Sequence, residues 1–230
     1  MSGATGTATV MAQTIWEWEF ALEILPDLAE GLITTVQATM TGAALALGLG
    51  LVLALLRRAH LKVVRWPIAF VIEFIRSTPL LVHLFFLFYA LPHLGITLSP
   101  FMAGMIGLGV HYATYTSEVY RAGIEGVPNG QWEAAKALNL PRRRLWAGVV
   151  LPQAIKSVLP PLGNYVIAMF KETPLLAFIT VVEVMRVAQS VGASTYRYLE
   201  PLTMVGILFF LIGYPFVLLL RRLEARLATP

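Results

Sequence analysis

The sequence of 230 residues contains no cysteine and few charged side chains. Without cysteine the chain has neither disulfide bonds nor thiolate metal ligands. Charged residues make up only 13% of the chain, against roughly 25% in soluble domains, whereas hydrophobic residues reach 57%. The four histidines are not spaced as metal ligands are, so no metal site is expected. This composition predicts an all-α integral membrane protein.

A nucleotide-binding loop is also missing, because the sequence contains no GxxxxGK[ST] motif. The glycines of residues 104–109 follow no predicted strand and lie within an apolar run. We interpret them, with those of residues 42–50, as small-residue faces for close helix packing. The chain itself is therefore expected to bind no cofactor and to have no ATPase activity.

Five apolar segments are long enough to be membrane helices, each of which needs about 20 apolar residues to cross a bilayer. They span residues 31–56, 67–91, 99–120, 157–181 and 201–220. The fourth segment is interrupted by Pro160, Pro161, Gly163 and Pro174. A helix broken at these residues would line a transport pathway, and a simple packing kink is the alternative.

Lysine and arginine are unevenly distributed between the loops that join these segments. Residues 57–66, 121–156 and 221–230 hold 13 of the 17 basic residues, whereas only Arg186 and Arg197 lie on the opposite side. The positive-inside rule then places the N-terminus outside, and the C-terminus and the loop of residues 121–156 in the cytoplasm. Five crossings satisfy this orientation, and six do not.

The chain is predicted to contain a single folded domain. Residues 1–13 are small and polar and are expected to form a flexible N-terminal extension. Residues 14–225 are expected to form the transmembrane domain, which begins with a segment rich in Trp and Glu that suits a membrane surface. Residues 226–230 are the C-terminal tail.

The loop of residues 121–156 contains a predicted helix. Pro128 suits the first turn of a helix, and residues 131–138 are mostly good helix formers. Asn139 occupies the position where a left-handed residue ends a helix, and Pro141 prevents continuation. The resulting helix of about three turns is either a docking element for another protein or a solvated hairpin. Its spacing alone does not decide between the two.

Four stretches resemble ABC-importer permeases of the polar-amino-acid (histidine, glutamine and arginine) family. They are Phe74–Val82 (FIRSTPLLV), Thr116–Ile124 (TSEVYRAGI), Val127–Ala135 (VPNGQWEAA), and the block that joins Leu151–Asn164 to Lys171–Leu175 (KETPL). The third stretch contains the EAA motif of the cytoplasmic coupling loop. The resemblance covers most of residues 20–225 and implies the type I ABC-importer permease fold, with five transmembrane helices.

The resemblance also implies a non-enzymatic permease subunit in the bacterial inner membrane. Its expected partners are a second permease subunit (homologous or identical), two ATP-binding cassette subunits that hold ATP and Mg²⁺, and an extracytoplasmic solute-binding protein. No nucleic-acid partner is implied. The residues expected to couple to the ATPase are Gln131, Glu133, Ala134, Ala135, Leu138, Asn139 and Pro141.

The chain departs from this family's usual pattern at several positions. Ser77, His83 and Asn139 stand where Gly, Gln and Gly are usual, and KETP stands in place of the commoner KDTS. The segments FALEILP (residues 20–26), KETPL and RYLEP (residues 197–201) are most similar to permeases for ectoine and hydroxyectoine. The expected substrate is therefore a small zwitterion: ectoine or hydroxyectoine, or otherwise a polar amino acid.

Ionisable side chains at membrane depth are costly, so they are commonly paired or functional. Glu73 and Arg76 are spaced i, i+3, which predicts an ion pair within one helix, with a functional role as the alternative. Glu118 is expected either to meet a substrate cation together with Tyr115, or to anchor Arg121 or Arg76. The candidate residues of the substrate path are Arg76, His83, Tyr115, Glu118, Lys171, Glu172 and Thr173.

Two other classes of protein are alternatives to the importer. A passive channel or secondary transporter for a small polar solute fits the buried charges and an interrupted fourth segment, but it does not explain the EAA-type loop. A membrane-bound enzyme has no support, because the sequence contains no nucleophile–base motif, metal spacing or cofactor loop.

Overall fold

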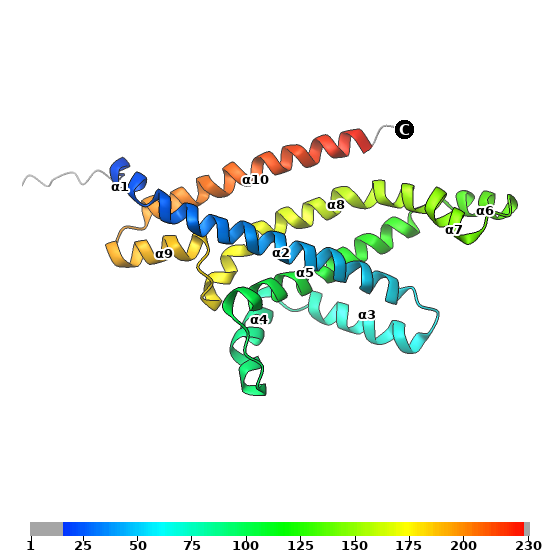
Figure 1. The fold of residues 1–230 in the computed structure, drawn as a ribbon, viewed down its shortest axis with the longest axis horizontal. Helices are drawn as coiled ribbons and strands as arrows, with labels where there is room; N and C mark the ends of the chain where they lie inside the picture. Colours follow the sequence, from blue (N-terminus) through cyan, green and yellow to red (C-terminus); the bar gives the residue numbers. More distant parts are fainter. Residues whose placement is uncertain (1–15, 228–230) are drawn as a thin grey trace, which may run out of the picture.

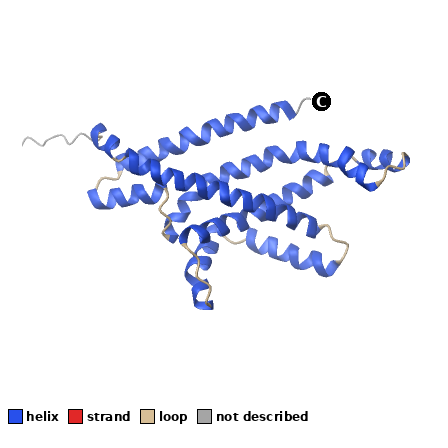
Figure 2. Ribbon diagram, viewed as in Figure 1, coloured by secondary structure: helices blue, strands red, loops and turns tan. Residues whose placement is uncertain are grey.

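The computed structural model describes residues 16–227, and every regular element within them is a helix (Figure 2). The elements of the first half are α1 (Trp18–Glu23), α2 (Leu25–Arg57), α3 (Lys62–Arg76), α4 (Leu80–Phe85), the π-helical turn η1 (Phe86–Ala90), the 3₁₀-helical turn η2 (Leu91–Leu94) and α5 (Pro100–Glu125). Those of the second half are α6 (Asn129–Ala137), α7 (Arg142–Leu145), the π-helical turn η3 (Trp146–Val150), α8 (Leu151–Glu172), the 3₁₀ helix η4 (Thr173–Ile179), α9 (Val184–Thr195) and α10 (Leu199–Leu227). The predicted flexible extension of residues 1–13 lies outside the described residues.

Within residues 16–227, three stretches are long and apolar enough to cross a membrane. They are α2, α10 and the continuous stretch Arg142–Ile179, which runs from α7 through α8 to η4. The pair formed by α3 and Leu80–Leu94 qualifies as a fourth span if its 102° bend is counted within one span. The predicted all-helical membrane fold is therefore confirmed, whereas the count of five spans and the orientation stay predictions.

Helix α5 was also expected to be a span. With 26 residues it is long enough, but it is less apolar than the three stretches above. Half of its residues are buried, because α2 packs along it (Figure 1). No other two described elements pack together as extensively. Its hydroxyl groups donate to backbone carbonyls, as Thr116 does to the Ala46 oxygen at 2.8 Å. Such polar groups are tolerated in a membrane where protein surrounds them. The buried half of α5, which carries Thr114, Thr116 and Ser117, thus faces protein.

The second apolar segment, residues 67–91, is broken where one unbroken span was expected. Helix α3 ends at Arg76 and α4 begins at Leu80, with a 102° bend between the two helices. Pro79 explains the break, because a proline disfavours the helical conformation of the residue before it. The break places residues 77–79 in a short turn, in which Ser77 and Pro79 are exposed.

The fourth segment is unbroken through Pro160, Pro161 and Gly163, so the interpretation of a break at these residues is wrong, whereas at Pro174 the α-helix does give way to the 3₁₀ helix η4. Helix α8 runs through Pro160 and Pro161, although a proline inside a helix costs about 3 kcal/mol. Packing on both sides offsets this cost: Val158 lies against Gly123 of α5, and Gly163 lies against Leu220 of α10. Contacts between helices therefore outweigh the tendency of the two prolines to break the helix.

The two ends of the molecule carry different elements (Figure 1). Helices α1, α9 and the start of α10 gather at one end, whereas α6 and α7 lie at the other, toward which α10 also runs. At the first end, Arg197 pairs with Glu17 at 2.7 Å and with Glu200, and its guanidinium lies over the Phe20 ring at 4.4 Å. Helix α1 is thereby fastened to the loop between α9 and α10.

Glycine allows α2 and α5 to approach closely. A Cβ atom at Gly50 would overlap the Thr116 side chain and lie 3.0 Å from the Ala113 carbonyl oxygen. A Cβ at Gly109 would likewise overlap Leu45, but one at Gly48 would meet nothing within 4 Å. The predicted small-residue packing is therefore confirmed for Gly50 and Gly109, and it is wrong for Gly48.

These contacts predict different effects for two neighbouring substitutions. We expect Gly50→Ala to destabilise the fold by about 1–3 kcal/mol, because an overpacked contact forces its neighbours to shift. Gly48→Ala is the control and is expected to leave stability nearly unchanged. Thermal unfolding of both purified variants in detergent, followed by tryptophan fluorescence, measures the difference. Equal melting temperatures for the two variants would contradict the close contact.

Candidate functional site

Helix α6 has well-defined ends. Its first residue, Asn129, follows Pro128, which lies just before the helix rather than in its first turn as expected. At the other end, Asn139 has a φ of 50°, and its N–H donates to the Lys136 oxygen at 2.9 Å, while the Leu140 N–H donates to the Ala135 oxygen at 3.0 Å. This pair of bonds is a Schellman motif, which satisfies carbonyls at a helix end. The nine residues of α6 form about two and a half turns.

The exposed surface of α6 is small and apolar along one face. Gly130, Ala134, Ala137 and Leu138 share this face by their spacing, and all four are exposed. Leu138 is 72% exposed and adds a large apolar side chain to this face. Ala135, in contrast, is buried. Of the residues predicted to couple to a partner, Ala135 therefore faces this chain, and the other six are exposed.

Glu118 belongs to a group of ion pairs that joins α2 to α5. Its carboxylate pairs with Arg57 at the end of α2, and it accepts hydrogen bonds from Arg121 at 2.8 and 2.9 Å. Arg121 also pairs with Glu125. Of the two interpretations of Glu118, anchoring of Arg121 is the one that the geometry supports. Arg76 instead pairs with Glu73 at 3.6 Å, as the i, i+3 spacing predicts.

A second candidate site is a cavity of about 460 Å³ at the break between α3 and α4. Helix α5 and the end of α8 supply its other walls. Its lining residues are Arg76, Ser77, Thr78, Pro79, Leu80, Leu81, His111, Tyr115, Glu172 and Leu175. The cavity therefore unites residues that lie almost a hundred positions apart in the sequence.

Unpaired polar atoms gather around this cavity. Among the residues that the structure describes, six buried side-chain atoms have no hydrogen-bond partner, and Trp16 supplies the one that lies at the far end of the molecule. The other five are Arg76 Nε, both ring nitrogens of His83, His111 Nδ1 and Glu172 Oε2. Leaving such an atom buried and unpaired costs about 1–3 kcal/mol. Their convergence indicates a site for a polar ligand.

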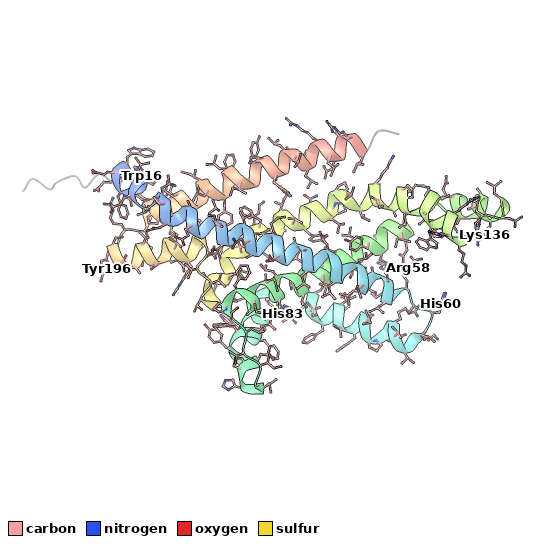
Figure 3. All side chains as sticks on the ribbon, in the orientation of Figure 1. Trp16, Arg58, His60, His83, Lys136 and Tyr196 are labelled. Carbon is pink, nitrogen blue, oxygen red and sulfur yellow. The ribbon has the colours of Figure 1, made fainter. Side chains whose placement is uncertain are left out.

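The aromatic and basic groups of the cavity lie in contact. The Arg76 guanidinium is 5.2 Å from the centre of the Tyr115 ring, and the His83 and His111 rings are 5.4 Å apart. Figure 3 shows His83 on α4, where this helix approaches α5. Arg76 and Glu172 bring a cation and a carboxylate to the same cavity. This arrangement can bind a small molecule that carries both signs of charge.

Not all of the predicted substrate-path residues meet here. Arg76, Tyr115 and Glu172 line the cavity, and His83 contacts it through His111. Lys171, however, is exposed, and Thr173 is buried and donates its hydroxyl to the Phe170 oxygen at 2.8 Å. Together with Glu118, these two residues lie outside the lining.

Sequence reasoning missed most of the cavity lining, including His111, and it missed Arg57 as the partner of Glu118. An i, i+4 spacing puts His111 and Tyr115 on one face of α5, and this was the available signal for His111. Arg57 lies 61 positions from its partner Glu118, so no local spacing could indicate the pair.

Comparison with known proteins gives a family match over residues 46–229, to the model described as "Binding-protein-dependent transport system inner membrane component". The "Probable amino-acid ABC transporter permease protein y4tG" of Sinorhizobium fredii is 48% identical over 196 residues, which are 85% of each chain. The "Arginine transport system permease protein ArtQ" of Bacillus subtilis is 35% identical over 189 residues, covering 82% of this chain and 86% of that protein.

Comparison with solved structures also finds ABC transporters of amino acids. The crystal structure of an amino acid ABC transporter with histidines matches with a TM-score of 0.87 and 33% identity, covering 92% of this chain and 99% of that one. An inward-facing structure of the MetNI methionine ABC transporter matches with a TM-score of 0.63 and 16% identity, covering 90% and 99% of the two chains. The second match supports the fold alone.

The left-handed residue at the end of α6 is open to a direct test. We expect Asn139→Val to destabilise the end of α6 by about 1–2 kcal/mol, because a β-branched residue is strained at a positive φ. Asn139→Gly keeps the Schellman motif and is expected to be neutral or slightly stabilising. Amide hydrogen exchange of residues 129–140 measures both. Equal protection in the two variants would show that this end does not depend on the left-handed residue.

Proposed function

The chain belongs to the family of binding-protein-dependent transport system inner membrane components, and on this premise we propose that it imports a polar amino acid. It is a multi-pass inner-membrane permease, the non-catalytic transmembrane component of an ABC transporter. Permeases of this kind work with an ATPase and a solute-binding protein. ATP and Mg²⁺ are proposed to bind to the ATPase chains and not to this one.

The unpaired polar atoms around the cavity are the observation that carries the choice of substrate. Glu172 Oε2 can accept a hydrogen bond from the ammonium group of an α-amino acid. The Arg76 Nε–H can donate one to its carboxylate. Hydrogen bonds to charged groups are stronger than those between neutral groups, and both ends of the zwitterion would gain one. His83 and His111 remain free to meet a polar side chain.

The relatives described above agree with this choice, since they are named for amino acids in general or for arginine. None of these names mentions ectoine, so the narrower expectation of an ectoine permease gains no support from them. Ectoine is also a zwitterion, and it remains the competing substrate that a transport assay must include.

Coupling to ATP hydrolysis is proposed to run through α6. Its exposed face of Gly130, Ala134, Ala137 and Leu138 offers a smooth surface against which another protein can dock. A short helix with a fixed end transmits a displacement, whereas a mobile loop would absorb it. The face therefore favours the docking element over the solvated hairpin, and a passive channel leaves it unexplained.

A second permease subunit, homologous or identical, is proposed to complete the pathway. The segment from α4 to η2 projects from the bundle (Figure 1). It exposes large apolar side chains, among them Phe86, Tyr89 and Leu94. With three or four candidate spans, one chain encloses the cavity incompletely, and a second would supply the missing wall.

The substrate assignment is tested by uptake into cells that express the complete transporter. We expect Glu172→Gln to lower the uptake of labelled arginine, histidine or glutamine by about tenfold or more, because a charge-assisted hydrogen bond is lost. Lys171→Gln, at the adjacent exposed residue, is the control and is expected to retain uptake. Ectoine uptake that resists competition by these amino acids would overturn the amino-acid assignment. Equal uptake by both variants would remove Glu172 from the path.

The role of α6 is tested by two matched substitutions of exposed leucines. We expect Leu138→Glu to abolish most of the solute-stimulated ATPase activity, because a charge would then be buried at the interface with the ATPase. Leu61, 68% exposed at the start of α3, provides the control variant Leu61→Glu. Copurification of the ATPase and hydrolysis in lipid nanodiscs are measured. Full activity of the Leu138 variant would contradict docking at this face.

A further inference from the structure

Helix α6 is joined to the rest of the protein mainly through η3, the start of the long stretch that becomes α8. A small hydrophobic core lies beneath it, formed by Ile124, Val127, Val150 and Ala154. Trp132 of α6 and Trp146 of η3 pack against this core. Besides the short connection to α5, these two indole rings are a route by which a displacement of α6 can reach the membrane helices.

The two rings have a defined geometry. Their centres are 5.6 Å apart and their planes meet at 82°, an edge-to-face contact of the kind that aromatic pairs prefer. The Trp132 Nε1–H donates to the Val127 oxygen at 3.3 Å, which ties its indole to the turn that precedes α6. The Trp132 ring is thus held from both sides.

Arg58 continues the contact to α2. Its guanidinium lies 5.7 Å from the centre of the Trp146 ring, within the range of a cation–π interaction. Arg58 directly follows the last residue of α2, and Figure 3 shows it at the end of this helix that lies toward α6 and Lys136. The preceding residue, Arg57, pairs with Glu118 of α5.

We propose that Trp132, Trp146 and Arg58 form a mechanical link, the Trp–Trp–Arg link, that carries the displacement of α6 to α2 and α5. This inference rests on the proposed function of α6 as the docking element. A cation over an aromatic face is attracted without a fixed hydrogen-bond direction, so the contact persists while the helices tilt. The residues of the link are positioning residues and do not touch the substrate.

The link moves α2 and α5 as one body. The two helices are in close contact at Gly50 and are joined by the Arg57–Glu118 ion pair at the end that the link reaches. Tyr115, one helical turn from Glu118, lines the substrate cavity. A displacement that starts at α6 thereby arrives at one wall of the cavity.

The test uses the permease reconstituted in proteoliposomes with its ATPase and solute-binding protein, and it measures solute imported per ATP hydrolysed. We expect Arg58→Gln and Trp146→Leu each to lower this ratio by roughly two- to fivefold, the range expected from the loss of an exposed cation–π contact. Arg58→Lys, which keeps the charge, is expected to restore most of it. Arg65→Gln, the same change at an exposed arginine of α3, is the control.

A double-mutant cycle separates the link from a general structural effect. The variant with both Arg58→Gln and Trp146→Leu should lose no more than either single variant, because each substitution already breaks the same contact. If Trp146→Leu does not fold, Trp146→Met, which is also apolar and has no aromatic face, replaces it. Unchanged ratios in the single variants, or losses that multiply in the double variant, would overturn the link. A wild-type complex without ATP-driven import would instead overturn the proposed function itself.

Discussion

The close contact between α2 and α5 is the constraint on which the rest of the structure depends. Helix α5 carries polar groups that a bilayer would not tolerate, and it is stable because protein covers them. Gly50 and Gly109 allow the approach, and the Thr116 hydroxyl donates to the Ala46 carbonyl across it. Once α5 is covered in this way, it can present His111 and Tyr115 to a cavity instead of to lipid.

The break between α3 and α4 complements this covered helix. A continuous second span would carry Arg76 along a regular helix face, where its only local partner is Glu73. In this structure the helix ends at Arg76 and the chain turns by 102°, and the guanidinium both pairs with Glu73 and lies over the Tyr115 ring. The cavity is thus created by an irregularity next to a rigid helix, which is where unpaired polar groups can be held ready for a ligand.

Local features of this chain could be predicted from the sequence, and features that depend on distant contacts could not. The helical membrane class, the left-handed Asn139 and the Glu73–Arg76 pair follow from composition or from spacing within one helix. The continuity of α8 through Pro160 did not follow, because contacts with α5 and α10 offset the local cost of proline. The Arg57–Glu118 pair and the convergence on the cavity likewise depend on how helices pack, and helical periodicity carries no information about that.

The cavity lining comes from several helices, which suggests how a solute would be released. His111 and Tyr115 belong to α5, which is proposed to move with α2, whereas Arg76 and Glu172 lie on α3 and at the end of α8. The two charged groups proposed to bind the solute are therefore on other helices than the aromatic wall. A relative rotation driven from α6 would separate this wall from Arg76 without changing any residue's own conformation. Affinity would then fall because the groups move apart, and it would return when they meet again, which is what alternating access requires of a binding site.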